Sequence, residues 1–489
     1  MSYGKSVAKN AFWLMMATTL NKLIAFASFA VVARLAGPHV TGTYFYSVSV
    51  TSVFVTLADL GMTPVLIRAI AAARHDGEKF LGAALRLKLI LAPIAILCAL
   101  GYGVLNNVDA ETIAAIAIAC LVMTADTYHL ALYGALRGRQ NLRPEAIGML
   151  VGQILTACAA VTAALFGLGA IGLVSALLIG STWNVLWAVM QARRLGIRIG
   201  VPAMAEYRIL LLESLPFAIA GIAVKGYSYI DSLLIHAYHG ASSVGLYAVG
   251  YKMTYAWQFL PLTFTAALYP AMASAWSKKD HEGLRNTFLG SLRVMAAISF
   301  PISAGLSALA PRIIPLVYGN EYIAAVPAFT VLAWVLIPIF LDFPIGSLLN
   351  ATHRAHLKTS AMVGTLFVNV VLNVILVPSL GPVGAAWAGV FSFWCLFFIG
   401  VVFIQRDAGG WSVPLWIILR ASFAAAVSWF AWRTIGDAMP LLVACLFGAS
   451  VAVSMAFLTR LVTPKDVTWI LSFRKRPLPS DEDETHAES

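Results

Sequence analysis

The chain has 489 residues, of which 60% are hydrophobic and only 11% are charged, and its formal net charge at pH 7 is +11. An ordinary soluble domain has about 25% charged residues, so this composition excludes a water-soluble fold. The apolar residues occur in long runs, and such runs cross a bilayer as helices once they reach about 20 residues. The chain is therefore predicted to be an all-α integral membrane protein.

About fourteen helices are predicted to cross the membrane, because the apolar runs separate into segments of suitable length. In chain order they occupy roughly residues 10–35, 41–62, 80–105, 111–136, 145–167, 169–192, 209–237, 244–276, 285–311, 323–351, 358–380, 382–405, 413–436 and 440–462. The connections between them are short, which leaves no room for a folded domain outside the membrane.

Lysine and arginine residues concentrate in alternate connections between these segments. One set of connections contains most of them, including Arg193 and Arg194, whereas the opposite set contains only Arg34, Arg312 and Arg433. Basic connections remain in the cytoplasm during insertion, so both chain ends are predicted to be cytoplasmic. This topology explains the positive net charge, and no nucleic-acid partner is expected.

An internal repeat links the two halves of the chain. At an offset of 203 residues the matching pairs are Lys22 with Lys225, Gly37 with Gly240 and Gly42 with Gly245. At an offset of 212 residues, the loop 168–172 matches the loop 380–384. Repeats with an even number of helices share one orientation, and two such lobes facing a central cavity suit alternating access. The matched glycines themselves are interpreted as close-packing positions.

The repeat also predicts the domain organisation. The predicted parts are an N-terminal six-helix lobe with its linker (1–208), a C-terminal six-helix lobe in parallel orientation (209–405), two additional helices (406–462) and a polar cytoplasmic tail (463–489). The tail contains a basic cluster at 474–476, which suits contact with anionic lipid, ahead of an acidic run at 481–484.

Several stretches, in this order, give the chain a family resemblance. They are the run 35–44, the segment 57–62, Tyr229–Asp231 followed by Val244–Tyr247, Leu316–Gly319 with Glu321 and Tyr322, and Asn369 and Asn373 ahead of Pro378 and the turn 381–387. Through them the chain resembles the Wzx-type polysaccharide or O-antigen flippases. That family belongs to the superfamily that also includes the multidrug and toxic-compound extrusion (MATE) transporters. The likeness covers nearly the whole chain up to about Leu461.

The resemblance implies a two-lobed, MATE-like bundle in the inner (cytoplasmic) membrane of a bacterial cell. It implies a flippase that moves an undecaprenyl-diphosphate-linked oligosaccharide to the outer leaflet, for O-antigen and other lipopolysaccharide, capsule or exopolysaccharide biosynthesis. The implied partners are membrane lipid, polysaccharide polymerases and chain-length or export proteins. The resemblance does not identify the sugar.

Two lysines lie near the middle of predicted helices, where a charge costs at least about 2.5 kcal/mol on insertion scales. Lys22 and Lys225 are repeat mates, so they would present two ammonium groups to one central cavity. This arrangement suits a diphosphate headgroup, and a packed structural ion pair is the alternative. Lys252 either extends the basic lining or reaches outward to the interface. Near the cytoplasmic boundary, Arg86 is a candidate lining residue, although it and Lys88 are expected to reach lipid headgroups.

Four membrane-embedded acids are candidate sites for a coupling Na⁺ or H⁺, namely Asp59, Asp126, Asp231 and Asp342. Such coupling needs a carboxylate whose charge is neutralised during transport. Asp126 lies one helical turn from His129, with Tyr133 on the same face. The alternative is pairing with basic neighbours, which is expected for Asp59 and for Glu213 near the cytoplasmic face.

No resident cofactor and no metal site are expected. His236 and His239 lie near the predicted outer boundary without acidic neighbours in the sequence. Two histidines in this setting are interpreted as interfacial polar residues rather than metal ligands.

Other functions fit the sequence less well. A drug or small-cation exporter of the related fold would favour a cavity of carboxylates and aromatic rings, whereas two central lysines favour an anion. A lipid-linked peptidoglycan precursor is a further substrate that the sequence leaves open. A polysaccharide polymerase or ligase would need charged residues in the outer connections, which are short and almost uncharged, so no enzyme activity is expected. The chain has no GxxxxGK[ST] motif, which excludes ATP hydrolysis by this chain as the energy source.

Overall fold

The computed structural model describes residues 3–461 apart from positions 73, 409, 411 and 436–437. Within this range every regular element is a helix and none is a strand, which confirms the all-α prediction. Eleven of the helices are long and apolar enough to cross a membrane. The chain is therefore a multi-pass membrane protein. The predicted tail, 463–489, lies outside the described residues.

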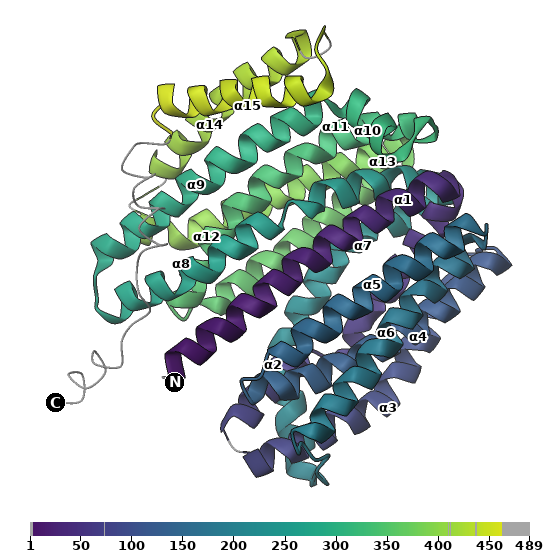
Figure 1. Ribbon diagram of the computed structural model, residues 1–489. Coiled ribbons are helices and arrows are strands. Elements are labelled where there is room, and N and C mark those ends of the chain that lie inside the picture. Colours follow the sequence, from purple (N-terminus) through teal and green to yellow (C-terminus); the bar gives the residue numbers. More distant parts are fainter. Residues whose placement is uncertain (1–2, 73, 409, 411, 436–437, 462–489) are drawn as a thin grey trace. The chain divides into compact units, whose positions relative to one another are not determined.

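The chain forms two compact units. In the first, which ends at Gly245, the elements are α1 (Tyr3–Asp59), α2 (Met62–Ala72), α3 (Arg74–Leu105), α4 (Ala110–Gly138), α5 (Arg143–Leu165), α6 (Gly169–Arg194) and most of α7 (Met204–Ala256). Figure 1 shows α4, α5 and α6 lying side by side, with α6 in contact with both of its neighbours. These helices form one wall of the site described below.

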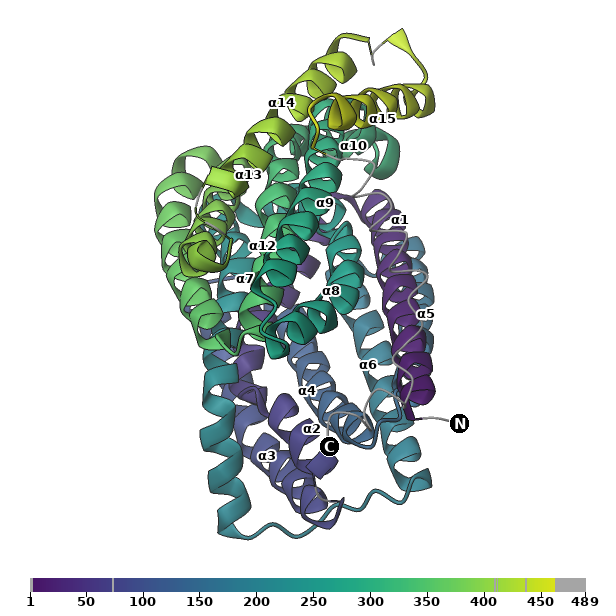
Figure 2. The same cartoon turned by 90° about the vertical axis from the view of Figure 1, so that its left-hand side faces the viewer.

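The second unit begins at Leu246, within α7. Its further elements are α8 (Phe259–Ser277), α9 (His281–Ala308), α10 (Ala310–Tyr318), η1 (Asn320–Ala325), α11 (Val326–Leu332), η2 (Ala333–Val335), α12 (Leu336–Ala351), α13 (Ala355–Ala408), α14 (Ser412–Ile435) and α15 (Leu441–Leu458). Figure 2 shows α14 and α15 next to each other, and α14 also packs on α9. The boundaries predicted for the two lobes remain a prediction.

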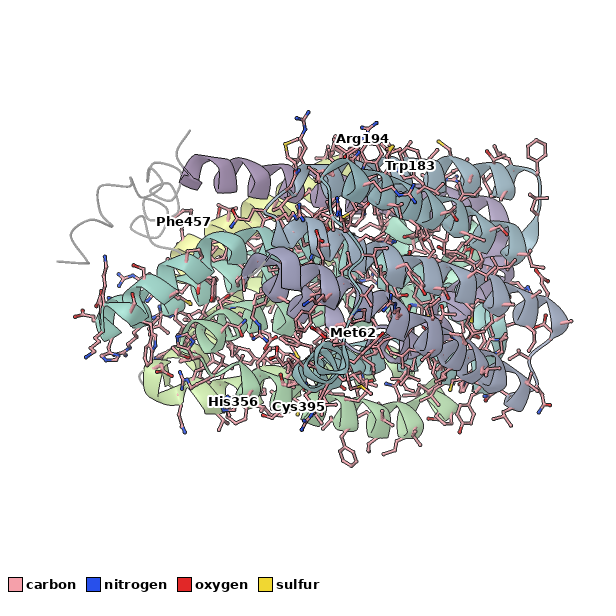
Figure 3. All side chains as sticks on the ribbon, turned by 90° about the horizontal axis from the view of Figure 1, so that it is seen from below. Met62, Trp183, Arg194, His356, Cys395 and Phe457 are labelled. Carbon is pink, nitrogen blue, oxygen red and sulfur yellow. The ribbon has the colours of Figure 1, made fainter. Side chains whose placement is uncertain are left out.

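Large apolar side chains cover much of the outside of the helices. Examples with exposed side chains are Leu97, Leu105, Phe166, Phe367, Phe423 and Leu446. Exposure on this scale would be unfavourable in water but is expected when the surrounding solvent is hydrocarbon. The inside of the first unit contrasts with it: Met62 is 1% exposed and lies within the bundle, whereas Arg194 points away from it (Figure 3).

Two segments differ from the sequence prediction. Residues 62–72, expected to form a connection, form α2 because Met62, Val65, Leu66 and Ile70 recur at helical spacing and are buried. The predicted helix 323–351 is divided by 3₁₀ turns at its start and at η2. Pro338 lacks the N–H that would bond to the carbonyl of residue 334, which lies within η2.

Three long helices bend at a glycine with positive φ. The dihedral angles are φ 76° and ψ 170° at Gly37 in α1, φ 77° and ψ 178° at Gly240 in α7, and φ 55° and ψ −133° at Gly381 in α13. Residues with a Cβ atom rarely adopt these φ values, so glycine is the residue that permits the bends. Each bend falls between two segments that the sequence analysis treats as separate helices.

Two further glycines allow close backbone contact between α1 and α7 beside these bends. A Cβ atom on Gly42 would collide with the carbonyl oxygen of Ala241, and one on Gly245 would collide with the carbonyl oxygen of Pro38. The two contacts are reciprocal. Gly42 meets the residue that follows the bend at Gly240, and Gly245 meets the residue that follows the bend at Gly37. This geometry agrees with the close-packing interpretation of the glycines.

We expect Gly42→Ala to lower the stability of the purified protein by about 1–3 kcal/mol, because the new methyl group meets backbone that has no rotamer to change. Thermal unfolding in detergent measures the effect. Gly101→Ala is the matched control, since nothing lies within 4 Å of a Cβ atom built on Gly101. Equal melting temperatures for the two variants would contradict the close contact.

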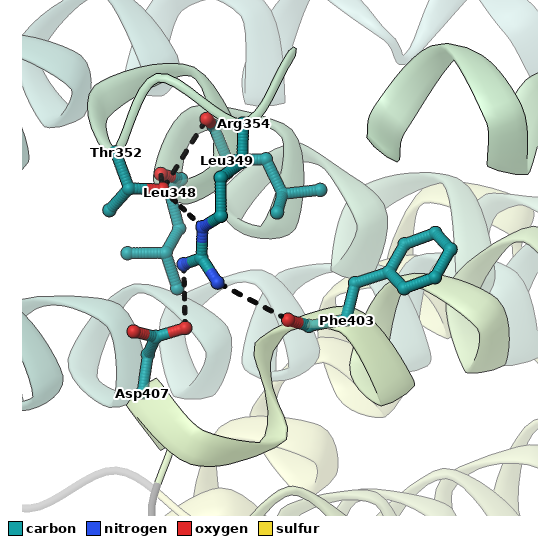
Figure 4. A network of polar contacts seen from close by, with 6 residues as sticks. All are labelled: Leu348, Leu349, Thr352, Arg354, Phe403 and Asp407. Carbon is teal, nitrogen blue, oxygen red and sulfur yellow. Dashed lines mark hydrogen bonds and ion pairs between the residues drawn. The ribbon is translucent and has the colours of Figure 1, made fainter. Parts of the chain in front are cut away.

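In each unit, an arginine in the connection between two helices forms hydrogen bonds with the C-terminal end of a helix that follows it in the chain. In the second unit, Arg354 donates to the Asp407 carboxylate at 2.6 Å, to the Phe403 carbonyl at 3.4 Å and to the Thr352 hydroxyl at 2.9 Å (Figure 4). In the first unit, Arg139 donates to the Leu195 carbonyl at 2.9 Å, at the end of α6. Charge-assisted bonds of this kind hold the helix ends in place around the interior.

Candidate functional site

A polar cavity of about 420 Å³ lies inside the first unit, between α1, α4, α5, α6 and α7. This volume falls within the range of small-molecule sites, about 300–1,000 Å³. Its polar lining residues are Asn21, Thr51, Ser52, Asp126, His129, Gln153, Thr156, Ser181, Asn184 and Lys225. Polar side chains are expensive inside membrane helices, so their concentration around one cavity marks it as the candidate functional site.

Two charged side chains of opposite sign line this cavity. Lys225 comes from α7, and its ammonium nitrogen lies 5.5 Å from the centre of the Tyr229 ring, a cation–π distance. Asp126 comes from α4, and its side chain keeps an exposed fraction of 40%. A ligand in the cavity therefore has access to both an ammonium group and a carboxylate.

Helical spacing sets the surroundings of Asp126. The predicted shared face is confirmed, because the Nδ1 atom of His129 lies 3.6 Å from Asp126 Oδ1 and the rings of His129 and Tyr133 meet edge to face at 5.4 Å. From α6, the Ser181 hydroxyl donates to Asp126 Oδ1 at 2.6 Å. These contacts fix the orientation of the carboxylate.

Asn184 on α6 links this helix to α4. Its Oδ1 atom accepts a hydrogen bond from the Tyr133 hydroxyl at 2.8 Å, and its amide donates to the Gly180 carbonyl at 3.0 Å. Gly152 and Gly180 allow α5 and α6 to approach closely here, since a Cβ atom on Gly180 would meet Thr156 and the Gly152 carbonyl. Asn184 is thus part of the framework of the cavity.

Lys22 is half-buried on α1, but the residue of α1 that lines the cavity at this level is its neighbour Asn21. The sequence analysis missed Asn21, Gln153, Ser181 and Asn184. Uncharged polar residues inside predicted membrane helices were the available signal, although many such residues serve only helix packing. The diphosphate role of Lys22 and Lys225 stays a prediction.

Two of the candidate acids pair with lysines. The ammonium group of Lys88 contacts Asp59, and that of Lys358 contacts both carboxylate oxygens of Asp342. Pairing of Asp59 with a basic neighbour was expected. The expectation that Lys88 reaches lipid headgroups is wrong, because its side chain is 0% exposed and its charge is satisfied internally.

The remaining candidates occupy varied positions. Arg86 is exposed on α3, Asp231 is 4% exposed on α7, and Lys252 is half-buried in the part of α7 that belongs to the second unit. None of the three is among the lining residues of the polar cavity. Glu213 pairs with Arg68, as expected near the cytoplasmic face.

The histidines near the predicted outer boundary are not part of a metal-binding cluster among the described residues. The ring of His236 stacks on Tyr46, with ring centres 3.8 Å apart. Over the part of the chain that the structure describes, no three His, Cys, Asp or Glu side chains lie where they could hold one metal ion.

A second cavity, of about 440 Å³, lies in the second unit and is almost entirely apolar. It is bordered by α9, α14 and α15, with Trp432 and Trp257 among its lining residues. It offers no charged group for recognition, so the polar cavity of the first unit is the better candidate for specific binding.

Two family models and several known proteins match this chain. The family model described as "Polysaccharide biosynthesis protein" matches residues 7–276, more than half of the chain, and the MatE model matches residues 216–375. Agl15 of Haloferax volcanii, a probable low-salt glycan biosynthesis flippase, is 24% identical over 387 residues, which cover 79% of this chain and 81% of Agl15. WzxC of Escherichia coli, a lipopolysaccharide biosynthesis protein, is 25% identical over 370 residues, which cover 73% of this chain and 72% of WzxC.

Among solved structures, the lipid II flippase MurJ in an inward closed conformation is similar with a TM-score of 0.73. The match covers 91% of this chain and 98% of MurJ at 13% sequence identity, so it shows a shared fold. Together with the family match over residues 7–276, these likenesses identify the chain as a member of the polysaccharide biosynthesis protein family.

Proposed function

We propose that the protein is a flippase, which moves polyprenyl-diphosphate-linked oligosaccharides across the cytoplasmic membrane by alternating access. The observation that supports this proposal most directly is the polar cavity inside the first unit, whose lining includes Lys225, Asp126 and uncharged polar side chains. A family member with such a cavity within its membrane-spanning helices can shield a polar headgroup from hydrocarbon. Agl15, named as a flippase, agrees with transport rather than with polymerase or ligase chemistry.

In this proposal Lys22 and Lys225 bind the diphosphate, and Lys252 and Arg86 extend the basic path at other stages of the cycle. Ammonium groups suit phosphate oxygens because charge-assisted hydrogen bonds are strong. Outward movement of the anionic headgroup is favoured by an inside-negative potential, by about 2.3 kcal/mol per charge per 100 mV.

A coupling Na⁺ or H⁺ is therefore optional for transport in this direction. At Asp59 and Asp342 such an ion would compete with the lysines that pair with these acids. Asp126 and Asp231 are the other two acids that we propose as candidates for coupling.

The proposed topology has fourteen crossings with both ends in the cytoplasm. Eleven helices are long enough to span, and three of them contain the bends at Gly37, Gly240 and Gly381, so each of these three is proposed to cross twice. The similar angles at Gly37 and Gly240 support the proposed repeat. Membrane lipid surrounds the protein in this proposal, and a polysaccharide polymerase and chain-length or export proteins are its proposed partners.

The second candidate function is an ion-coupled exporter of drugs or other small molecules. The match of the MatE model to residues 216–375 supports it. Lys225 in the polar cavity argues against a cationic substrate, because it would repel a positive charge.

The decisive experiment reconstitutes the purified protein in liposomes that contain an undecaprenyl-diphosphate oligosaccharide. We expect protein-dependent exchange of this lipid between leaflets, measured by the accessibility of its glycan to an added lectin or glycosidase. Protein-free liposomes are the control. No exchange of any diphosphate lipid, together with export of a cationic dye, would replace the flippase by the exporter.

A further inference from the structure

The polar cavity of the first unit contains groups that a diphosphate does not need. Among the described residues, its lining includes one ammonium group, that of Lys225, and one carboxylate, that of Asp126. A diphosphate bound at Lys225 leaves the Asp126 carboxylate without a role, because like charges at short range repel each other in a medium of low dielectric constant. The part of the cavity next to Asp126 therefore suits a different portion of the substrate.

Unused hydrogen-bonding atoms indicate what that portion is. Asn21 lines the cavity, and its Oδ1 atom is buried without a hydrogen-bond partner in the part of the chain that the structure describes. Buried polar atoms are nearly always paired in folded proteins, so the unpaired amide oxygen of this lining residue is a candidate acceptor for a ligand. Asp126 Oδ1 is held by Ser181, which presents the carboxylate in a fixed orientation.

A neutral sugar ring has the matching chemistry. Each hydroxyl group both donates and accepts, and a carboxylate that accepts from hydroxyl groups forms charge-assisted bonds. The cavity volume of about 420 Å³ lies within the range of small-molecule sites. We propose that the polar cavity binds an uncharged sugar of the lipid-linked glycan, with Asp126 and Asn21 accepting from its hydroxyl groups, and that it selects against sugars with a carboxylate. This inference rests on the proposed flippase function.

A bound cation is the competing explanation for Asp126. Two features of the cavity oppose it. Lys225 lines the same space and repels a second positive charge, and Asp126 is the only carboxylate among the lining residues that the structure describes. Both features make the hydroxyl groups of a neutral ligand better partners for Asp126 than a cation.

The test compares two diphosphate lipids that differ only in the sugar next to the diphosphate, a neutral hexose in one and the corresponding uronic acid in the other. We expect the wild-type protein to exchange the neutral lipid at least about 10-fold faster than the acidic lipid, because the neutral sugar makes one more charge-assisted hydrogen bond. Asp126→Asn is expected to slow the neutral lipid by about 10-fold and to remove most of the preference, because the acidic sugar no longer meets a like charge.

Ser181 supplies a second variant and a matched control. Ser181→Ala releases the carboxylate from its fixed orientation and is expected to slow the neutral lipid several-fold. Ser175→Ala alters the same helix at a hydroxyl that donates to the Ile171 carbonyl at 2.8 Å and is not among the cavity-lining residues, so it should leave exchange unchanged. Thermal unfolding of each variant shows whether it is folded.

The outcomes separate the two proposals. Equal slowing of both lipids by Asp126→Asn and Ser181→Ala, with the preference intact, would overturn the sugar site. A change confined to the response to an imposed Na⁺ or H⁺ gradient would overturn it in favour of ion coupling. If the wild-type protein exchanges neither lipid, the flippase function itself fails, and the sugar site with it.

Discussion

Exchange of a diphosphate-linked oligosaccharide between leaflets is expected to fall by about 100-fold or more when Lys22 and Lys225 are both replaced by alanine. Each hydrogen bond to a charged group contributes about 1.5–3 kcal/mol, so losing two of them removes at least a factor of about 100. Each single variant is expected to lose about 10-fold. The measurement is the leaflet-exchange rate in proteoliposomes with matched protein content.

Two control pairs make this result specific. Lys278→Ala with Lys279→Ala removes two exposed lysines from the connection between α8 and α9 and is expected to leave exchange unchanged. Lys22→Arg with Lys225→Arg keeps both charges and is expected to retain part of the activity. A folded double alanine variant with the wild-type rate would remove both lysines from the mechanism while leaving the function in place.

The second large effect concerns the buried ion pair between Lys88 and Asp59. The side chain of Lys88 is 0% exposed and that of Asp59 is 20% exposed, so Asp59→Asn leaves a buried ammonium group without a counter-charge. Removing one partner of a buried pair lowers the free energy of unfolding by about 3–5 kcal/mol. We expect a loss of this size in denaturant titrations of the purified protein.

The double variant Lys88→Met with Asp59→Leu distinguishes a structural pair from a coupling site. Buried pairs replaced by apolar residues are often as stable as the original, so stability should return to within about 1 kcal/mol of wild type. Lipid exchange that also returns would exclude Asp59 as a coupling acid. Wild-type stability in Asp59→Asn alone would show that Lys88 does not depend on this partner.

The membrane-spanning, all-helical class and the position of most helices follow from the amino-acid sequence alone. The reason is that the bilayer imposes a length and an apolar composition on each crossing, and both are visible without knowledge of neighbours. The predicted helix boundaries also left Gly37, Gly240 and Gly381 between separate segments, and the structure has a bend with positive φ at each of them. The family followed from ordered motifs along nearly the whole chain.

Which polar groups meet depends on how the helices pack against one another. Lys88 was interpreted as an interfacial residue because it lies close to the end of its predicted helix. Its actual partner, Asp59, is 29 positions away in the sequence, so helix boundaries alone do not reveal the contact. The cavity likewise combines Asn21, Asp126, Ser181 and Lys225 from four helices. Helical periodicity fixes which residues share a face, as for Asp126 and His129, but the rotation of each helix against its neighbours depends on side-chain packing across the whole unit.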